Sequence, residues 1–189
     1  MAVTTLDPGT ALIVIDLQKG IVSNPSVLGA DAVVAHACEL AAAFRAHALP
    51  VVLVTVSGGA PGRTQLPPGT VKRAPDWAEL ITELGPKPGD ISVVKRTWGA
   101  FASTDLAGQL SKLGVTHVVI AGISTSIGVE STARQAFELG LNVTLATDAM
   151  SDTNADAHHN SISLIFPRLG ETGSTREIIA LLDARRPGA

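Results

Sequence analysis

Short apolar runs alternate with helix-like stretches along the whole chain, and this alternation restricts the folds open to it. Five runs rich in aliphatic and β-branched residues lie at 11–15, 51–56, 91–94, 117–120 and 141–146, and a shorter sixth strand is expected at 171–173. Such runs are typical of parallel strands buried on both faces. Helices are expected at 30–47, 76–84, 104–113, 129–139, 154–166 and 174–182. The order predicts an α/β fold of Rossmann-like type, a three-layer, doubly wound, mostly parallel six-stranded sheet with helices on both faces.

Composition limits the functions open to this fold. The 189 residues, of which 46% are hydrophobic and 16% charged, are expected to form a single domain over 1–189. The chain has 14 basic and 17 acidic residues, and the basic residues form no run. A small molecule is therefore expected as the partner, rather than nucleic acid or a membrane. One cysteine, Cys38, excludes an internal disulfide, and no basic segment followed by a long apolar core opens the sequence. We therefore expect a cytoplasmic protein.

Two charged residues follow predicted strands directly. Asp16 ends the first apolar run and Lys95 follows the third. The carboxyl ends of parallel strands meet at the edge where such folds bind ligands, and a desolvated base raises a carboxyl pKa toward values useful for acid–base chemistry. Each residue also has a plainer interpretation: Asp16 as a turn or helix-capping residue, and Lys95 as a strand-end lysine that points into solvent.

Glycine marks the two loops expected to border the ligand. After the fourth strand the turn Gly122-Ile123-Ser124-Thr125-Ser126-Ile127-Gly128 enters a helix, and Gly128 would leave room for an anion beside free helix N–H groups. Its plainer interpretation is a turn glycine with positive φ. The Gly- and Pro-rich segment 57–69 follows the second strand and forms either a lid or pocket wall, or a solvated connection.

In these positions the chain resembles the isochorismatase-like (cysteine hydrolase) superfamily along nearly its whole length. The resemblance is carried by Asp16, by Lys95 and by the turn that ends at Gly128. Supporting pieces are Gln18 and the segments 98–106, 157–159 and 165–171. Members with a cysteine in the turn attack amides through the thiol, but here Gly128 stands in the thiol's place. Covalent amide hydrolysis through a thioester is therefore not expected.

The resemblance implies a role for each site residue. Isochorismatases share the glycine, and in them the aspartate protonates the vinyl carbon of an enolpyruvyl ether before water adds. Asp16 would then be the general acid, Lys95 would bind a carboxylate or ether oxygen, and N–H groups around Gly128 would complete an anion site. A cis peptide is expected at Ile123–Ser124. The expected substrate contacts are Gln18, Arg63, Trp98, Phe101, Ile123, Ser124 and Ile127.

Two departures from the family pattern bear on the substrate and on metals. Isochorismatases often carry tyrosine where this chain has Ser124, and the sequence contains no tyrosine, so the contacts to a substrate must differ. The segment 55–61 lacks the aspartate and histidine of the nicotinamidase metal site, so neither metal nor cofactor is expected. The resemblance also implies a homo-oligomer, either a dimer or a tetramer.

Three functions stay open on the sequence. The first is a metal-free hydrolase that uses Asp16 as acid or base on an isochorismate-like vinyl ether or another small anionic substrate. The second is a catalytically altered or inactive relative that binds a small metabolite. The third is water-mediated hydrolysis of an amide or imide, with Asp16 acting as a base toward water.

Overall fold

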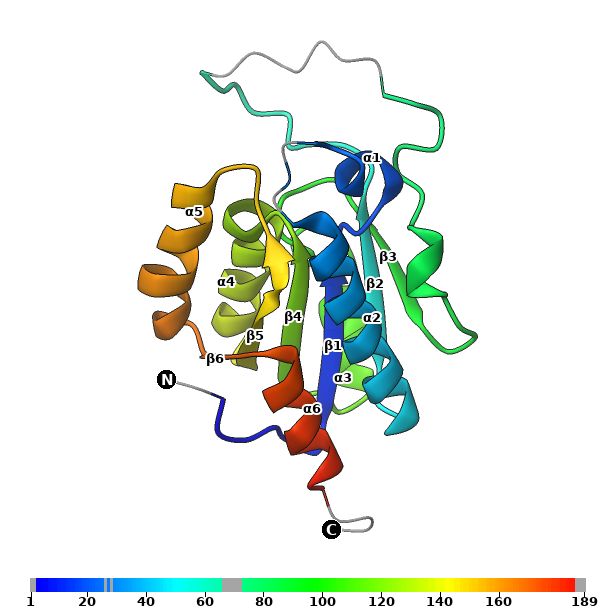
Figure 1. Ribbon diagram of the computed structural model, residues 1–189, viewed down its shortest axis with the longest axis vertical. Helices are drawn as coiled ribbons and strands as arrows, with labels where there is room; N and C mark the ends of the chain where they lie inside the picture. Colours follow the sequence, from blue (N-terminus) through cyan, green and yellow to red (C-terminus); the bar gives the residue numbers. More distant parts are fainter. Residues whose placement is uncertain (1–2, 26, 28, 66–72, 186–189) are drawn as a thin grey trace.

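A six-stranded, entirely parallel sheet forms the centre of the molecule (Figure 1). The computed structural model describes residues 3–25, 27, 29–65 and 73–185. The strands are β1 (Thr10–Ile15), β2 (Val51–Val56), β3 (Ile91–Lys95), β4 (His117–Ile123), β5 (Asn142–Ser151) and β6 (Glu171–Gly173), in the order β3-β2-β1-β4-β5-β6. The chain winds outward from β1 to β3 and then returns to β4 beside β1. The doubly wound fold expected from the sequence is confirmed, and the switch point lies between β1 and β4.

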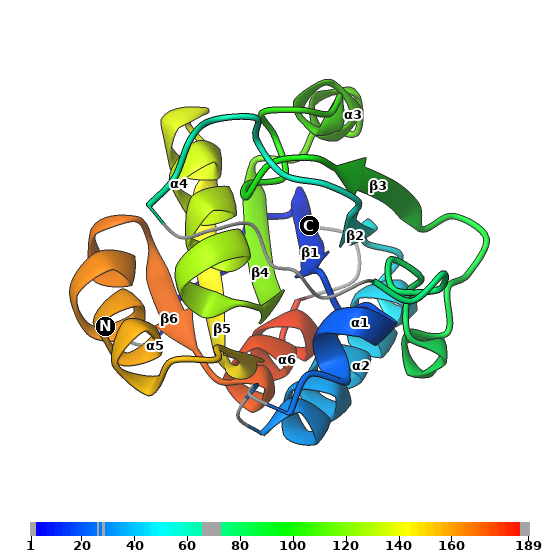
Figure 2. The ribbon, with the colours of Figure 1, turned by 90° about the horizontal axis from the view of Figure 1, so that it is seen from above.

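Helices cover both faces of the sheet (Figure 2). Alternate residues of β1 point to opposite sides, and each side has its own apolar core. Leu12 and Val14 pack with α2 (Ala30–Ala46) and α6 (Thr175–Asp183), whereas Ile13 and Ile15 pack with α3 (Leu106–Lys112) and α4 (Glu130–Glu138). Two short helices, α1 (Lys19–Val22) and α5 (Ala155–Asn160), complete the set.

The helix expected at 76–84 is wrong. The segment forms turns and a 3-10 turn at Thr82–Leu84, because several of its backbone groups bond to the segment after β1 and are not available for a continuous helix. Lys19 N donates to the Glu79 carbonyl at 2.8 Å and Gly20 N donates to the Trp77 carbonyl at 3.0 Å. These two donors belong to the short helix α1, which the sequence analysis missed and which contacts this segment.

Two other boundaries also differ from the prediction. The helix expected at 154–166 is interrupted: α5 gives way to a π-helical turn at Ser161–Ile165 and a 3-10 turn at Phe166–Arg168. Strand β5 runs five residues past the predicted end at 146, after a register shift in its pairing with β4 between Ile120 and Gly122. Among the described residues, no helix combines the length and apolar character needed to cross a membrane.

Candidate functional site

Asp16 lies at the carboxyl end of β1, next to the switch point of the sheet. Its backbone has φ of 53°, in the left-handed region that non-glycine residues seldom adopt, and its N–H donates to the Val54 carbonyl of β2 at 2.9 Å. This conformation turns the chain sharply where the strand ends. The residue is only 4% exposed, so its carboxylate is held in the protein interior.

Lys95 meets this carboxylate from the other side of β2. It is the last residue of β3, is 1% exposed, and its Nζ donates to Asp16 Oδ2 at 2.7 Å and to the Thr97 carbonyl at 3.2 Å. The interpretation of Lys95 as a solvent-pointing strand end is therefore wrong. The sheet brings together two opposite charges that lie 79 residues apart in the sequence.

Burial decides the protonation of this pair. Removal of Asp16 from water raises its pKa from 3.8 to about 6, although the charge and hydrogen bond of Lys95 pull in the opposite direction. Asp16 Oδ1 is buried and has no hydrogen-bond partner among the described residues. Since Lys95 binds Oδ2, the unpartnered Oδ1 is the oxygen on which a proton is expected. The carboxyl can thus change its protonation state close to neutral pH.

Gly128 borders the same carboxylate. It lies in a π-helical turn, Thr125–Val129, that follows β4 and leads into α4, and the peptide bond Ile123–Ser124 before the turn is cis. A Cβ atom at Gly128 would lie 3.2 Å from Asp16 Oδ2 and 2.8 Å from Ile15 Cγ2. Gly128 does not have positive φ, so close approach to β1, and not a left-handed turn, requires glycine here.

Two residues that the sequence analysis did not select hold this turn in place. The Asp152 carboxylate, 2% exposed, accepts hydrogen bonds from the backbone N–H and the hydroxyl of Ser126, both at 2.8 Å. The Thr125 hydroxyl pairs with Nδ1 of His158, on α5, at 2.8 Å. Because Asp152 already occupies the Ser126 N–H, this donor is not free for a substrate anion.

The other predicted substrate contacts differ in their access to a ligand. Gln18 is fully buried, and its amide bonds to the backbone of Val56 and Trp77. Its amide therefore links the segment after β1 to the end of β2 and to the backbone at Trp77. Phe101 is buried in the core beside α4, and Trp98, three residues earlier, is 63% exposed.

The remaining contacts come from the turn and the glycine-rich loop. Ile123 is buried as the last residue of β4, Ser124 is half-buried and Ile127 is exposed. Arg63 is exposed on 57–65, which has no regular structure and rises above the carboxyl ends of the strands (Figure 1). Part of the predicted lid, 66–69, lies outside the described residues. Across the described ranges, no three His, Cys, Asp or Glu side chains gather as a metal site would require.

Comparison with known proteins gives a consistent family. The sequence model described as the Isochorismatase domain matches residues 10–177. An isochorismatase family protein of Escherichia coli O157:H7, YecD, is 46% identical over 92% of this chain and 96% of its own. The ureidoacrylate amidohydrolase RutB of Variovorax paradoxus is 30% identical over 78% of this chain and 71% of its own. The structure of an isochorismatase family protein from Burkholderia thailandensis superposes with a TM-score of 0.90 at 41% identity, covering 95% of this chain and 98% of that one.

Proposed function

Because the chain belongs to the isochorismatase family, whose members are hydrolases, we propose that it hydrolyses a small anionic vinyl ether with Asp16 as the general acid. The observation that carries the proposal is the state of Asp16, a buried carboxyl whose pKa burial raises to about 6. A general acid is most effective when its pKa lies near the working pH.

The reaction takes three steps at the enol ether: protonation of carbon, addition of water and breakdown of the hemiketal. Neutral Asp16 gives its proton to the terminal vinyl carbon, and the electron pair of the double bond forms the new C–H bond. The adjacent carbon becomes an oxocarbenium ion, to which water adds. Loss of a proton from this water gives a hemiketal. As the bond from its carbon to the ether oxygen breaks, the hemiketal hydroxyl forms the ketone C=O and its proton passes to the ether oxygen, which releases a keto acid and an alcohol. The released proton restores the acid, so atoms and charges balance.

Lys95 and the turn after β4 supply the electrostatic environment of these steps. The ammonium group, 2.7 Å from Asp16 Oδ2, stabilises the carboxylate that remains after proton transfer. A third N–H of Lys95 is available to a substrate carboxylate or ether oxygen, since two are used by Asp16 and Thr97. Gly128 keeps the space beside Oδ2 free of any side chain.

A second candidate is water-mediated hydrolysis of an amide. The relative RutB is named a ureidoacrylate amidohydrolase, which favours this chemistry. In that reaction ionised Asp16 would take a proton from water as the water attacks the carbonyl carbon, and would return the proton to the leaving nitrogen. The two candidates require opposite protonation states of one residue.

The pH dependence of turnover separates them. Isochorismate is assayed by pyruvate release and ureidoacrylate by loss of the amide, with wild type and the Asp16→Asn variant. General acid catalysis predicts a kcat/KM that is level below about pH 6 and falls above it, whereas a general base predicts a rise through the same range. Binding of isochorismate without pyruvate release in the wild type would overturn the proposal, and binding of both compounds without turnover would favour the metabolite-binding alternative.

We also propose that the protein acts without metal or cofactor, as a cytoplasmic homo-oligomer, with neither nucleic acid nor a membrane as its partner. The absence of Asp and His from 55–61 supports the first statement. Exposed apolar side chains at the helix ends and in the segments between helices, such as Leu113, Leu139 and Leu164, support association. Size-exclusion chromatography coupled to light scattering measures the oligomeric state. A dimer or a tetramer is expected, and a monomer would contradict the proposal.

A further inference from the structure

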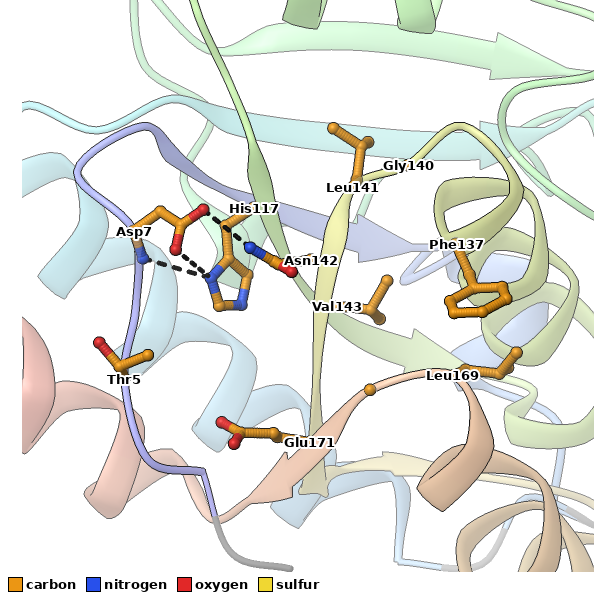
Figure 3. A pocket seen from close by; sticks show the side chains of 11 residues that line it. Thr5, Asp7, His117, Phe137, Gly140, Leu141, Asn142, Val143, Leu169 and Glu171 are labelled. Atoms are coloured by element: carbon orange, nitrogen blue, oxygen red, sulfur yellow. Dashed lines mark hydrogen bonds and ion pairs between the residues drawn. The ribbon is translucent and has the colours of Figure 1, made fainter.

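A cavity of about 390 Å³ opens at the amino ends of the strands, whereas Asp16 lies at the carboxyl end of β1. Figure 3 shows the residues that line the cavity. Its walls come from the segment before β1 and from the starts of β4, β5 and β6, together with the end of α4. None of the residues assigned above to hydrolysis lines it. A volume of this size is within the range that small-molecule ligands occupy.

One wall of this cavity is apolar. Phe137, Leu141, Val143 and Leu169 line it, and the Phe137 side chain is half exposed, so an aromatic surface faces the opening. Large aromatic side chains left in water next to a concave surface are common at recognition sites. An aliphatic or aromatic group of a ligand would cover this wall.

The facing wall carries two carboxylates. Hydrogen bonds from Thr116 lower the pKa of Asp7, with Asn142 adding to the effect. Burial raises the pKa of Glu171, but hydrogen bonds from Thr4 outweigh it and leave the pKa below its ordinary value. Both groups are therefore ionised at neutral pH, and no lysine or arginine is among the eleven lining residues.

His117 does not offset this charge. Its pKa is lowered, mainly by burial, and its Nδ1 accepts the backbone N–H of Asp7 at 3.3 Å, which places the ring proton on Nε2 beside the Thr144 hydroxyl. The Asp7 carboxylate lies 3.7 Å from Nδ1, and its charge favours protonation of the ring, but burial outweighs this effect and leaves the pKa of His117 lowered. Arg185 is not among the lining residues, but it donates to the Asp7 carbonyl at 2.6 Å and its charge interacts with the Asp7 carboxylate.

The Asp7 carboxylate keeps one oxygen for a ligand. Its Oδ2 accepts from the Thr116 hydroxyl at 2.7 Å and from the Asn142 amide at 3.0 Å, which uses both lone pairs of this oxygen. Its Oδ1 has no hydrogen bond to these groups and faces His117. Each Glu171 oxygen accepts from Thr4, and the backbone N–H of Thr5 also bonds to this carboxylate, which leaves fewer lone pairs for a ligand than at a free carboxylate.

From the apolar wall, the two carboxylates and the lack of a lining cation, we propose that this cavity is a second binding site, for a small organic cation with an apolar body. An amidinium or ammonium head donates to Asp7 and Glu171, and the body packs on Phe137 and Leu141. This ligand class is opposite in charge to the anionic substrate proposed for the Asp16 site. The two sites therefore need not compete.

Benzamidine is a suitable probe, with benzamide as its neutral near-isostere and benzoate as the anion of similar shape. Amide ¹H–¹⁵N shifts of the full chain are followed during titration with each compound. Saturable shifts at Asn142, Gly170 and Glu171 are expected with benzamidine. Benzamide is expected to bind about tenfold more weakly, and benzoate is expected to cause no saturable shifts. Added salt is expected to weaken the binding of benzamidine.

Two variants separate the contributions of the walls. Glu171→Gln is expected to weaken the binding of benzamidine about fivefold to tenfold. Phe137→Ala, at a half-exposed position where the substitution does not endanger the fold, is expected to weaken the binding of both benzamidine and benzamide. Glu39→Gln, on α2 and far from the cavity, is the matched control and is expected to change nothing. Equal shifts with benzamide and benzamidine, shifts confined to other residues, or unchanged affinity in both cavity variants would each overturn the proposal.

Discussion

Replacing Lys95 with methionine isolates what the buried cation does to Asp16. The substitution keeps a long side chain of similar volume in a position that is 1% exposed, but it removes the charge 2.7 Å from Asp16 Oδ2. The carboxylate is then buried with no counterion. Its neutral form, in contrast, is almost unaffected, so the effect of the substitution on stability must depend on pH.

The magnitude follows from the pKa of Asp16. A folded-state pKa of about 6, against 3.8 for the ordinary group, means that the folded protein binds this proton more tightly than the unfolded chain. The wild type therefore loses about 3 kcal/mol of its free energy of unfolding as pH rises from below 4 to above 6. Loss of a contacting opposite charge raises a carboxyl pKa by about 1 to 3 pH units, which adds a further loss of about 1.4–4 kcal/mol at higher pH.

Urea unfolding at about pH 5 and about pH 8.5 measures the difference. We expect Lys95→Met to be much more destabilising at the higher pH, and Lys112→Met, at an exposed lysine of α3, to change stability by less than about 0.5 kcal/mol at both. Equal losses of stability for Lys95→Met at the two pH values would refute the reasoning, because they would show that Asp16 does not change its charge between them.

Other substitutions test the turn and the acid. Gly128→Ala places a methyl group 2.8 Å from Ile15 Cγ2 and is expected to cost about 1–3 kcal/mol by urea unfolding, since the β-branched Ile15 in the core cannot move freely. Asp152→Asn weakens the two bonds to Ser126 and is expected to destabilise the fold by about 1–3 kcal/mol and to lower kcat more than it changes KM. Asp16→Asn is expected to remove turnover of the vinyl ether while the variant still binds the product, which calorimetry can measure.

A specific result would contradict each of these three predictions. An unchanged free energy of unfolding in Gly128→Ala would mean that the turn is farther from β1 than the structure places it. Full activity in Asp152→Asn would show that the turn needs no support from β5. Residual turnover of Asp16→Asn close to the wild-type rate would assign the proton transfer to another group.

The sequence was sufficient to predict the juxtaposition of Asp16 and Lys95 because it depends on a general property of parallel sheets. In a parallel sheet, residues that directly follow strands lie at the edge formed by the carboxyl ends of the strands. The winding order also places the ends of β1 and β4 side by side. The same reasoning located Gly128. It could not show that Ile15, rather than a positive φ, is the reason for glycine there, because that contact joins β1 to the turn after β4, two segments far apart in sequence.

Contacts between distant segments also explain what the sequence analysis missed. The segment 76–84 contains helix-compatible residues, but its carbonyls accept from the backbone after β1, so tertiary hydrogen bonds replaced local ones. With a strand expected to end at 146, nothing in the sequence indicated that the Asp152 carboxylate contacts the turn after β4. Only the longer strand brings its carboxylate to Ser126.

The protonation of Asp16 is the claim on which the proposed chemistry depends most directly. A ¹³C NMR titration of the aspartate side-chain carboxyls, with Asp16→Asn to assign the resonance, measures it without a substrate. A titration midpoint near 6 is predicted from the burial of this group against Lys95. A midpoint close to 4, where an ordinary aspartate titrates, would leave the carboxylate ionised throughout the working range and would contradict its role as the acid.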